Sequence, residues 1–138
     1  MIKGITAGNF DVIHPGYIRF FNDAKTHACD YLIIALHGDP TIERPHKAKP
    51  ILTVEERTEI LLSLKAIDEV VCYNTEEELL CLLKEIRPTV RILGSDYAGK
   101  SFTGDKLSIP VYYHERNHDW STTRFKNEIT EQVLKQRR

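Results

Sequence analysis

The stretch IKGITAGNFDVIHPGYIRFFNDAKTHACDYLIIAL, residues 2–36, contains the pattern that predicts the fold. Residues 2–7 form a short apolar run that stops at Gly8, as a buried strand does. Apolar residues then recur at helical spacing over residues 16–28. Residues 30–36 are a continuous apolar run of strand length, which is typical of parallel strands covered on both faces.

The same alternation continues to the end of the chain. Capping boxes at Thr53 with Glu56 and at Thr75 with Glu78 predict two helix starts. We expect further strands at 67–73, 90–93 and 109–113, and helices at 53–65, from 75 to before Pro88, and at 121–135. This order predicts one α/β domain over residues 1–138, a Rossmann-like open sheet of about five parallel strands with helices on both faces. Ligands of such sheets bind beyond the carboxyl ends of the strands, where the loops at 8–14, 37–50, 94–105 and 114–121 should gather.

Composition excludes several classes of partner. The chain has 138 residues, 41% hydrophobic and 28% charged, as expected for one globular domain. A formal net charge of −1 provides no field for nucleic acid or an anionic membrane, so we expect neither partner. Any anionic ligand must be held by a local cluster of basic groups. No apolar run approaches the roughly 20 residues that span a bilayer.

The cysteines indicate the compartment. Cys29, Cys72 and Cys81 show no CxxC spacing, and an odd number without metal-ligand spacing favours free thiols in a reducing cytoplasm. We expect each to be a buried, small apolar residue, not a nucleophile.

Two distant segments each lead into the start of an expected helix. They are GNFDVIHPGY at 8–17 and WSTTRF at 120–125. A helix N-terminus presents unpaired N–H groups and a partial positive charge, so two of them in one domain favour a multiply phosphorylated ligand. Neither GxxxxGK[ST] nor GxGxxG is present. The alternative interpretation is structural, with His14-Pro15 only a turn before a helix and Ser121 only an N-cap.

The two segments resemble signatures of the nucleotidyltransferase superfamily named for its HxGH motif. Residues 8–17 are similar to G-x-F-D-x-x-H-x-G-H, and residues 121–124, STTR, to the S-[ST]-[ST] segment that opens the last helix. Arg57 within EER, IDEVV at 67–71 and GSDYAGK at 94–100 resemble the small cytidylyltransferases. The closest resemblance is to glycerol-3-phosphate cytidylyltransferases, with similarity to ethanolamine-phosphate, heptose-phosphate and archaeal flavin-nucleotide enzymes.

The resemblance implies an activity and its requirements. It implies transfer of CMP from CTP to a small phosphorylated alcohol, glycerol 3-phosphate or a related polyol or sugar phosphate, with release of pyrophosphate. The substrate phosphate attacks the α-phosphorus in line and no covalent enzyme intermediate forms, so catalysis rests on positioning and charge neutralisation. Magnesium is the implied cofactor and a homodimer the implied assembly. The alternative within enzymes is an adenylyltransferase that uses ATP on a similar acceptor.

The resemblance also assigns site residues. His14 would stabilise the pentacoordinate α-phosphate, and Lys47 and Arg116 complete the catalytic set. Asp11 would orient the turn or help to hold magnesium. The implied nucleotide-binding residues are Gly8, Asn9, Phe10, Asp11, His14, Tyr17, Gly94, Asp96, Tyr97, Arg116, Ser121, Thr122 and Thr123. The implied substrate-binding residues are Lys47, Lys49 and Arg57.

Alternatives remain open within these assignments. The resemblance does not say which of Lys47 and Lys49 is the key lysine, and both also fit a solvated loop. Arg57 also fits a surface helix residue in a salt bridge. Asp96 and Tyr97 lie where the family reads the base. The other histidines show no metal-ligand spacing and are interpreted as structural or exposed, although His118 flanks the phosphate segment.

The sequence departs from the signature at Tyr17, where the family has its second histidine. Tyrosine keeps a donor hydroxyl but cannot carry positive charge. Loss of one transition-state donor costs roughly 10²–10³ in rate. Either Tyr17 serves as the donor, or a basic residue such as Lys47, Arg116 or His118 supplies the charge, or the domain is a non-catalytic nucleotide-binding protein. We favour a working enzyme because the other phosphate-binding positions match.

Overall fold

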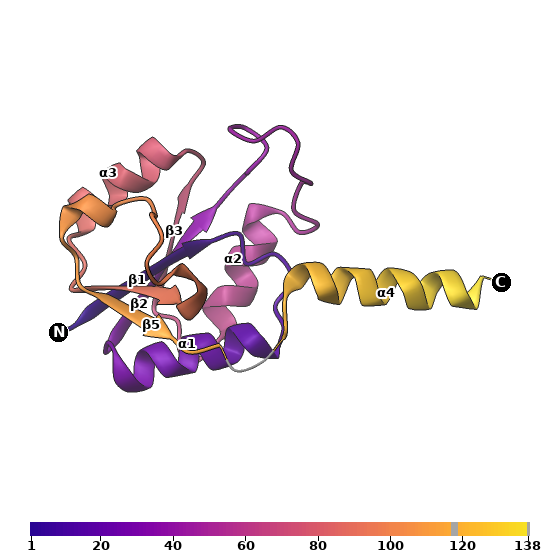
Figure 1. The fold of residues 1–138 in the computed structure, drawn as a ribbon, viewed down its shortest axis with the longest axis horizontal. Coiled ribbons are helices and arrows are strands. Elements are labelled where there is room, and N and C mark those ends of the chain that lie inside the picture. The colour runs from indigo at the N-terminus through magenta and orange to yellow at the C-terminus, as the bar shows by residue number, and fades with distance from the viewer. Residues whose placement is uncertain (117–118, 138) are drawn as a thin grey trace.

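The computed structural model describes residues 1–116 and 119–137, and its centre is one parallel sheet (Figure 1). The strand order is β3-β2-β1-β4-β5, and every pairing is parallel. The strands are β1 (Lys3–Gly8), β2 (Tyr31–His37), β3 (Glu69–Tyr73), β4 (Val90–Gly94) and β5 (Val111–His114). The helices are α1 (Pro15–His27), α2 (Val54–Ser63), α3 (Glu76–Ile86) and α4 (Thr122–Gln136). The predicted α/β fold with an open parallel sheet is therefore confirmed.

The predicted element boundaries agree with the structure to within two residues. Both capping boxes form, with Thr53 and Thr75 accepting from the backbone N–H groups of Glu56 and Glu78. The last strand begins at Val111, two residues later than predicted. Ser108 has a φ of 59°, and Pro110 directly precedes the strand. Proline has no N–H group to donate to a ladder.

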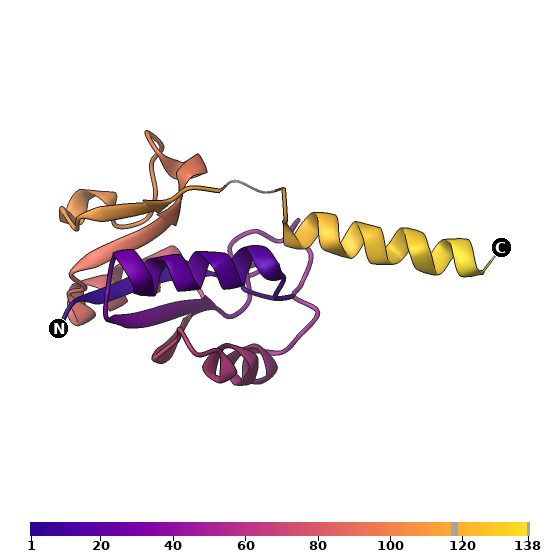
Figure 2. The same cartoon turned by 90° about the horizontal axis from the view of Figure 1, so that it is seen from below.

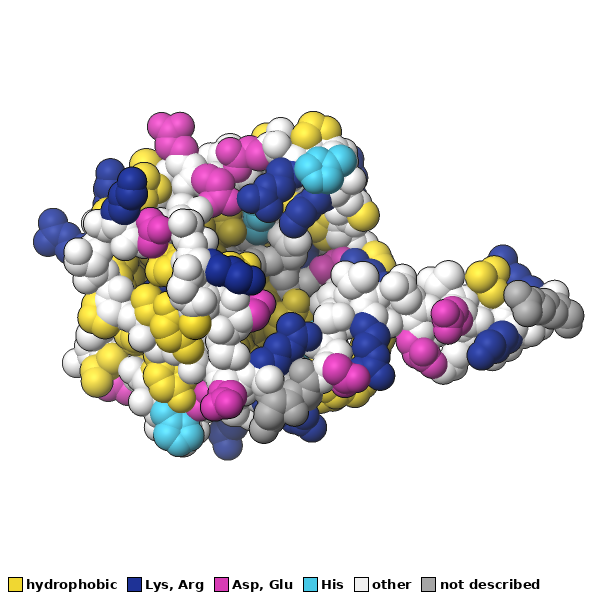
Figure 3. Space-filling model, in the orientation of Figure 1, with side chains coloured by type: hydrophobic (Ala, Val, Ile, Leu, Met, Phe, Trp, Pro, Cys, Tyr) yellow, Lys and Arg dark blue, Asp and Glu magenta, His cyan; other side chains and the backbone are white. Residues whose placement is uncertain are grey.

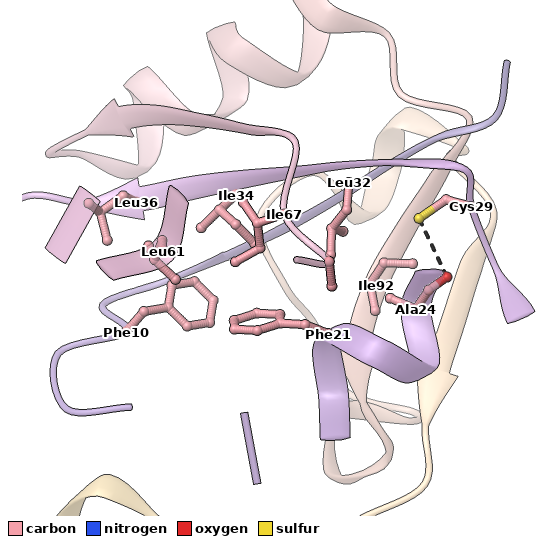
Figure 4. Close-up of a cluster of buried hydrophobic side chains, with 11 residues drawn as sticks. Phe10, Phe21, Ala24, Cys29, Leu32, Ile34, Leu36, Leu61, Ile67 and Ile92 are labelled. Atoms are coloured by element: carbon pink, nitrogen blue, oxygen red, sulfur yellow. Dashed lines mark hydrogen bonds between the residues drawn. The ribbon is translucent and has the colours of Figure 1, made fainter. Parts of the chain in front are cut away.

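Side chains of the strands alternate between two apolar layers. In β2, Leu32, Ile34 and Leu36 face the layer under α1 and α2, which also contains Phe21 and Leu61 (Figure 4). Ile33 and Ala35 face the second layer, which contains Leu79 and Leu83 of α3. This alternation buries both faces of the sheet, as the continuous apolar strands require.

The topology creates a crevice between β1 and β4. The chain runs from β1 to β2 and β3 on one side and returns to β4 and β5 on the other. The loops that follow β1 and β4 therefore diverge at this point, which is where open α/β sheets bind ligands.

Helix α4 projects from the body (Figures 1 and 2). None of its described residues is buried, and Ile129, Val133 and Leu134 are exposed. Its first turns contact the body through Thr122, the ring of Phe125 and Lys126. In the part of the chain that the structure describes, no helix is both long enough and apolar enough to cross a membrane.

The cysteines agree with the prediction only in part. All three are free thiols, and Cys29 is buried beside Ala24. Cys72 and Cys81 are exposed, so the prediction that each cysteine is buried is wrong for these two. Cys72 lies on an edge strand, β3, in which Tyr73 alone is buried.

Candidate active site

A cavity of about 540 Å³ opens beyond the carboxyl ends of β1 and β4. Figure 3 shows Lys and Arg side chains around the hollow on this face. The volume falls within the roughly 300–1,000 Å³ of small-molecule sites. The predicted site residues that line it are Gly8, Asn9, Phe10, His14, Tyr17, Lys47, Gly94, Asp96, Tyr97, Arg116, Ser121 and Thr122. The structure thus brings together two motifs that lie more than 100 positions apart.

His14 is the N-cap of α1 and is 5% exposed. Its Nδ1 accepts a hydrogen bond of 3.0 Å from the backbone N–H of Gly16. A ring nitrogen that accepts cannot also carry the proton, so the neutral ring has its hydrogen on Nε2. His14 therefore combines the structural role of a cap with a donor atom for an anion in the cavity it lines.

Tyr17 joins the two helix starts. Its hydroxyl lies 3.1 Å from Oγ1 of Thr122, and its ring stacks on His14 with centroids 4.3 Å apart. Trp120 lies on the imidazole as well, with centroids 5.8 Å apart. The residue that departs from the signature thus contacts both predicted phosphate-binding segments.

The turn after β1 has a strained backbone. Phe10 adopts a φ of 46°, in the left-handed region that non-glycine residues rarely occupy. Its ring is buried in the core, and a Cβ on Gly8 would approach that ring to 3.2 Å. Packing of Phe10 therefore holds the turn in this conformation, with Gly8, Asn9 and Phe10 in the cavity wall.

Asp11 has a structural role in the described residues. It is 4% exposed, and its carboxylate accepts from the N–H groups of Ile51 and Leu52 at 2.8 and 2.9 Å and from Nζ of Lys126 at 2.8 Å. Burial alone would raise its pKa, but these three hydrogen bonds together lower it. The interpretation that Asp11 orients the turn fits this geometry.

The same contacts do not fit the metal-ligand prediction for Asp11. Both carboxylate oxygens are already engaged, and the residue does not line the cavity. The described residues contain no cluster of three or more His, Cys, Asp or Glu side chains that would hold a metal ion. The residues present therefore do not fit a protein-bound magnesium at Asp11.

Arg57 lies beneath the site, 2% exposed. Its guanidinium donates four hydrogen bonds to backbone carbonyls. The acceptors, at 2.7–3.1 Å, are those of Asn9, His37, Gly38 and Leu52. The surface salt-bridge alternative is wrong, because Arg57 is buried and its guanidinium fixes the loops that follow β1 and β2. The substrate-contact prediction gains no support from this geometry, since Arg57 is not among the residues that line the cavity.

The two loop lysines differ in position. Lys47 lines the cavity, whereas Lys49 is exposed and is not among the lining residues. This placement favours Lys47 as the lysine that reaches a bound phosphate. Thr123 likewise lies outside the cavity lining, one residue beyond Thr122.

The far rim of the cavity contains Arg116 and the start of α4. The Arg116 backbone N–H donates to Oγ of Ser95 at 3.3 Å, and its Nη2 donates to the carbonyl of Trp120. Ser121 is the N-cap of α4, with its Oγ accepting from the Arg124 N–H at 3.0 Å. The N-cap interpretation of Ser121 is therefore confirmed, and the residue also lines the cavity. His118 and Asn117 lie outside the described residues.

The predicted base-reading residues follow β4. Asp96 and Tyr97 line the cavity, and both are exposed. A Cβ on Gly94 would approach the Asp96 carboxylate to 2.5 Å, so a larger residue there would displace the Asp96 side chain.

Sequence analysis missed one end of the cavity. Its walls include Arg44, Tyr73, Glu76, Arg91 and Phe102. Arg91 is 5% exposed within β4, VRILG. A single charged residue inside an apolar strand is the signal in the sequence that would have found it.

His114 was interpreted as structural or exposed, and it lies in the cavity wall, 9% exposed. Its Nδ1 is 2.7 Å from Oδ2 of Asp23. The other oxygen of that carboxylate, Oδ1, accepts from the hydroxyl of Tyr112 and lies 2.8 Å from Nδ1 of His27. Burial of Asp23 opposes ionisation, but these hydrogen bonds lower the pKa of the Asp23 carboxyl. The charged carboxylate thereby fixes the ring of His114.

Comparison with known families agrees with this site. The sequence matches the family described as cytidylyltransferase-like over residues 5–130. The chain belongs to that family. Its members are nucleotidyltransferases, so the predicted superfamily and enzyme class are confirmed.

The chain matches only part of the length of its curated relatives. FAD synthase of Ferroglobus placidus is 36% identical over 96 residues, which cover 70% of this chain and 60% of that protein. Bifunctional protein HldE of Bradyrhizobium sp. (strain ORS 278) is 34% identical over 105 residues, 75% of this chain and 21% of that protein. The match with this chain therefore spans about a fifth of HldE and three fifths of FAD synthase.

A solved structure supports the fold. The lipopolysaccharide core biosynthesis protein from Thermoplasma volcanium GSS1 superposes with a TM-score of 0.70 over 86% of this chain and 99% of that chain. Sequence identity in this pair is 22%, so the comparison supports the fold of this chain and nothing further.

Proposed function

We propose that the domain transfers CMP from CTP to the phosphate of a small phosphorylated alcohol, glycerol 3-phosphate or a related polyol or sugar phosphate, and releases pyrophosphate. The observation that carries the proposal is the convergence of two helix N-termini on one cavity, linked by Tyr17 and Thr122. The family assignment and the loop lysine on the cavity wall support it.

In this proposal an oxygen of the acceptor phosphate forms a bond to the α-phosphorus. The bond from that phosphorus to the oxygen shared with the β-phosphorus breaks, and pyrophosphate leaves with the electron pair. Nε2–H of His14 donates to an oxygen of the reacting α-phosphate, where negative charge must be held in place. Lys47 and Arg116 supply positive charge, and the N-terminus of α4 receives the β- and γ-phosphates.

Tyr17 acts as a neutral donor and as a positioning residue in this scheme. Its hydroxyl meets Thr122, and its ring supports His14. The charge that a second histidine would supply comes from Lys47 and Arg116, the two site cations predicted from the sequence that line the cavity. The rival function is nucleotide binding without turnover. It requires that Lys47 and Arg116 fail to supply the charge of the missing histidine.

A second candidate is transfer of AMP from ATP to a similar acceptor. The relative named FAD synthase favours it, because the product in that name contains an adenylyl group. CTP remains our first choice because the matching family is described as cytidylyltransferase-like.

Two further points belong to the proposal. Magnesium is proposed on the resemblance alone; it would neutralise charge on the nucleotide, and no step above depends on a metal ligand from the protein. A homodimer is proposed on the resemblance alone, and sedimentation equilibrium tests it, with a single 15.9 kDa species contradicting it.

Pyrophosphate release tests the function. CTP and ATP are each incubated with magnesium and a panel of phosphorylated polyols, sugars, amino alcohols and FMN, and thermal shift reports nucleotide binding in parallel. Release with CTP and a polyol or sugar phosphate is expected. Release only with ATP would select the second candidate. Stabilisation by a nucleotide without release from any acceptor would favour the binding protein.

A further inference from the structure

The cavity has a second end that the phosphate-binding motifs do not use. It is lined by Tyr73, Glu76, Leu79, Arg91, Phe102 and Thr103. Tyr73 and Leu79 belong to the apolar layer under α3, whereas Phe21 of α1 belongs to the opposite layer. This end therefore lies on the α3 face of the sheet, away from α1, and we call it the acceptor end.

Arg91 is the least satisfied charged group at the acceptor end. It is 5% exposed, and its Nη1 donates to the Thr103 carbonyl at 2.8 Å while its guanidinium lies 5.4 Å from the ring centroid of Phe102. Nε of Arg91 is buried without a hydrogen-bond partner. No carboxylate in residues 1–116 or 119–137 forms an ion pair with Arg91 within 4.0 Å.

A comparison within the molecule shows that this is unusual. Arg57 is equally buried but donates four hydrogen bonds to carbonyls. Arg91 donates one, and burial lowers its pKa, an effect that the nearby Tyr73 and Glu76 oppose. Buried charges are normally paired, because an unpaired donor or charge loses the hydration it had in water. Arg91 thus lacks an anionic partner that a ligand in the cavity would provide.

The other charged groups at this end are consistent with an anion. Arg44 lines the rim and is exposed. Burial raises the pKa of Tyr73 to about 12, and the charges of Arg91 and Arg44 oppose this rise. Glu76 is engaged, because its carboxylate accepts from the hydroxyl of Thr103. Two cations therefore face one carboxylate that already has a partner.

We propose that the acceptor carries a second acidic group, a carboxylate or phosphate besides the phosphate that attacks, and that Arg91 binds this group at the acceptor end with Arg44 at the rim. The inference rests on the proposed function, since it concerns the acceptor of the same site. Arg91 lines the cavity, and its Nη1 is held by the Thr103 carbonyl, so its charge is fixed beside the space where this group would lie. Lys47, which also lines the cavity, remains for the attacking phosphate.

Matched ligand pairs that differ only in the acidic group test this. The probes are 3-phosphoglycerate against glycerol 3-phosphate and, for a longer reach, 6-phosphogluconate against glucitol 6-phosphate. Calorimetry on the full chain measures their dissociation constants without requiring turnover. We expect the acid of at least one pair to bind about tenfold or more tightly than its alcohol, as a charged hydrogen bond predicts.

Variants separate recognition from folding. Arg91→Gln should bring the acid-to-alcohol affinity ratio close to one, while Arg91→Lys should keep part of the preference. Arg19→Gln, on the exposed surface of α1, is the control and should leave the ratio unchanged.

A purely structural loss would weaken both members of a pair equally. Equal affinity in both pairs, preference for the alcohols, no binding of any probe, or a preference that survives Arg91→Gln would overturn the proposal. Failure of pyrophosphate release with all acceptors, despite an Arg91-dependent preference, would count against the transfer reaction alone.

Discussion

The hydroxyl of Tyr17 lies 3.1 Å from Oγ1 of Thr122, so the first turns of α1 and α4 are joined across 105 positions of sequence. Thr122 also contacts the carbonyl of Val12 at 3.4 Å. Because α4 projects from the body, these contacts and the ion pair of Lys126 with Asp11 determine where its N-terminus lies. Placement of the phosphate site therefore depends on a few polar contacts and on the ring of Phe125, which stacks on His14.

Tyr17→Phe removes the link but keeps the ring on His14. We expect a loss of about 1 kcal/mol in the free energy of unfolding and a clear fall in pyrophosphate release, since one hydrogen bond is lost while the packing remains. Tyr17→His restores the histidine of the signature and should leave activity unchanged or raise it. Urea unfolding and steady-state kinetics on both variants measure this. A large loss in Tyr17→His would show that the tyrosine has a dedicated role.

Asp11 should make the free energy of unfolding depend on pH in the acidic range. Its pKa is lowered in the folded protein from an ordinary value of 3.8, because its hydrogen bonds outweigh the burial that opposes them. A lowered folded pKa stabilises the fold above the unfolded pKa, and the stabilisation is lost as pH falls through the folded value. Wild type should therefore lose stability below about pH 4. Asp11→Asn should be less stable at neutral pH and decline less steeply, and parallel pH curves for the two proteins would contradict this.

Arg57→Lys tests a structural role. Lysine has the same charge but cannot donate to the four carbonyls that Arg57 binds. We expect a loss of about 3 kcal/mol in the free energy of unfolding, from buried carbonyls left without donors. Below the new melting temperature KM for the acceptor should change little. A large rise in KM without loss of stability would instead support the prediction that Arg57 contacts the substrate.

The loop lysines form a matched pair. Lys47→Ala should reduce kcat/KM by about tenfold or more, because a cation on the cavity wall is removed. Lys49→Ala, two residues away and outside the lining, should stay within about twofold of wild type. Equal losses, or a greater loss at Lys49, would show that the loop adopts another arrangement with substrates bound.

The sequence predicted the elements well because local signals agreed with the tertiary fold. Apolar runs, two capping boxes and Pro15 at the start of α1 place the boundaries without knowledge of packing. The motif residues on the cavity wall were found because a helix N-terminus is a local feature that also binds anions.

Arg57, Asp11 and Arg91 show where such reasoning fails. Arg57 stands within EER, which is typical of an exposed helix face, yet its four acceptors come from three separate segments. Asp11 is satisfied by Lys126, which lies 115 positions away. The burial of Arg91 beside Phe102 depends on the segment that follows β4 folding back over the sheet. Each depends on pairings between distant segments that no local pattern encodes.

The most direct test of the account is His14→Asn. Asparagine can accept the Gly16 N–H bond as the N-cap does now, so the melting temperature should stay within a few degrees of wild type. The donor at Nε2 is lost, so pyrophosphate release with CTP and a responsive acceptor should fall roughly 10²–10³-fold. That loss in a folded protein is the predicted result. Activity above a tenth of wild type, with the fold intact, would contradict the role of His14 in transfer.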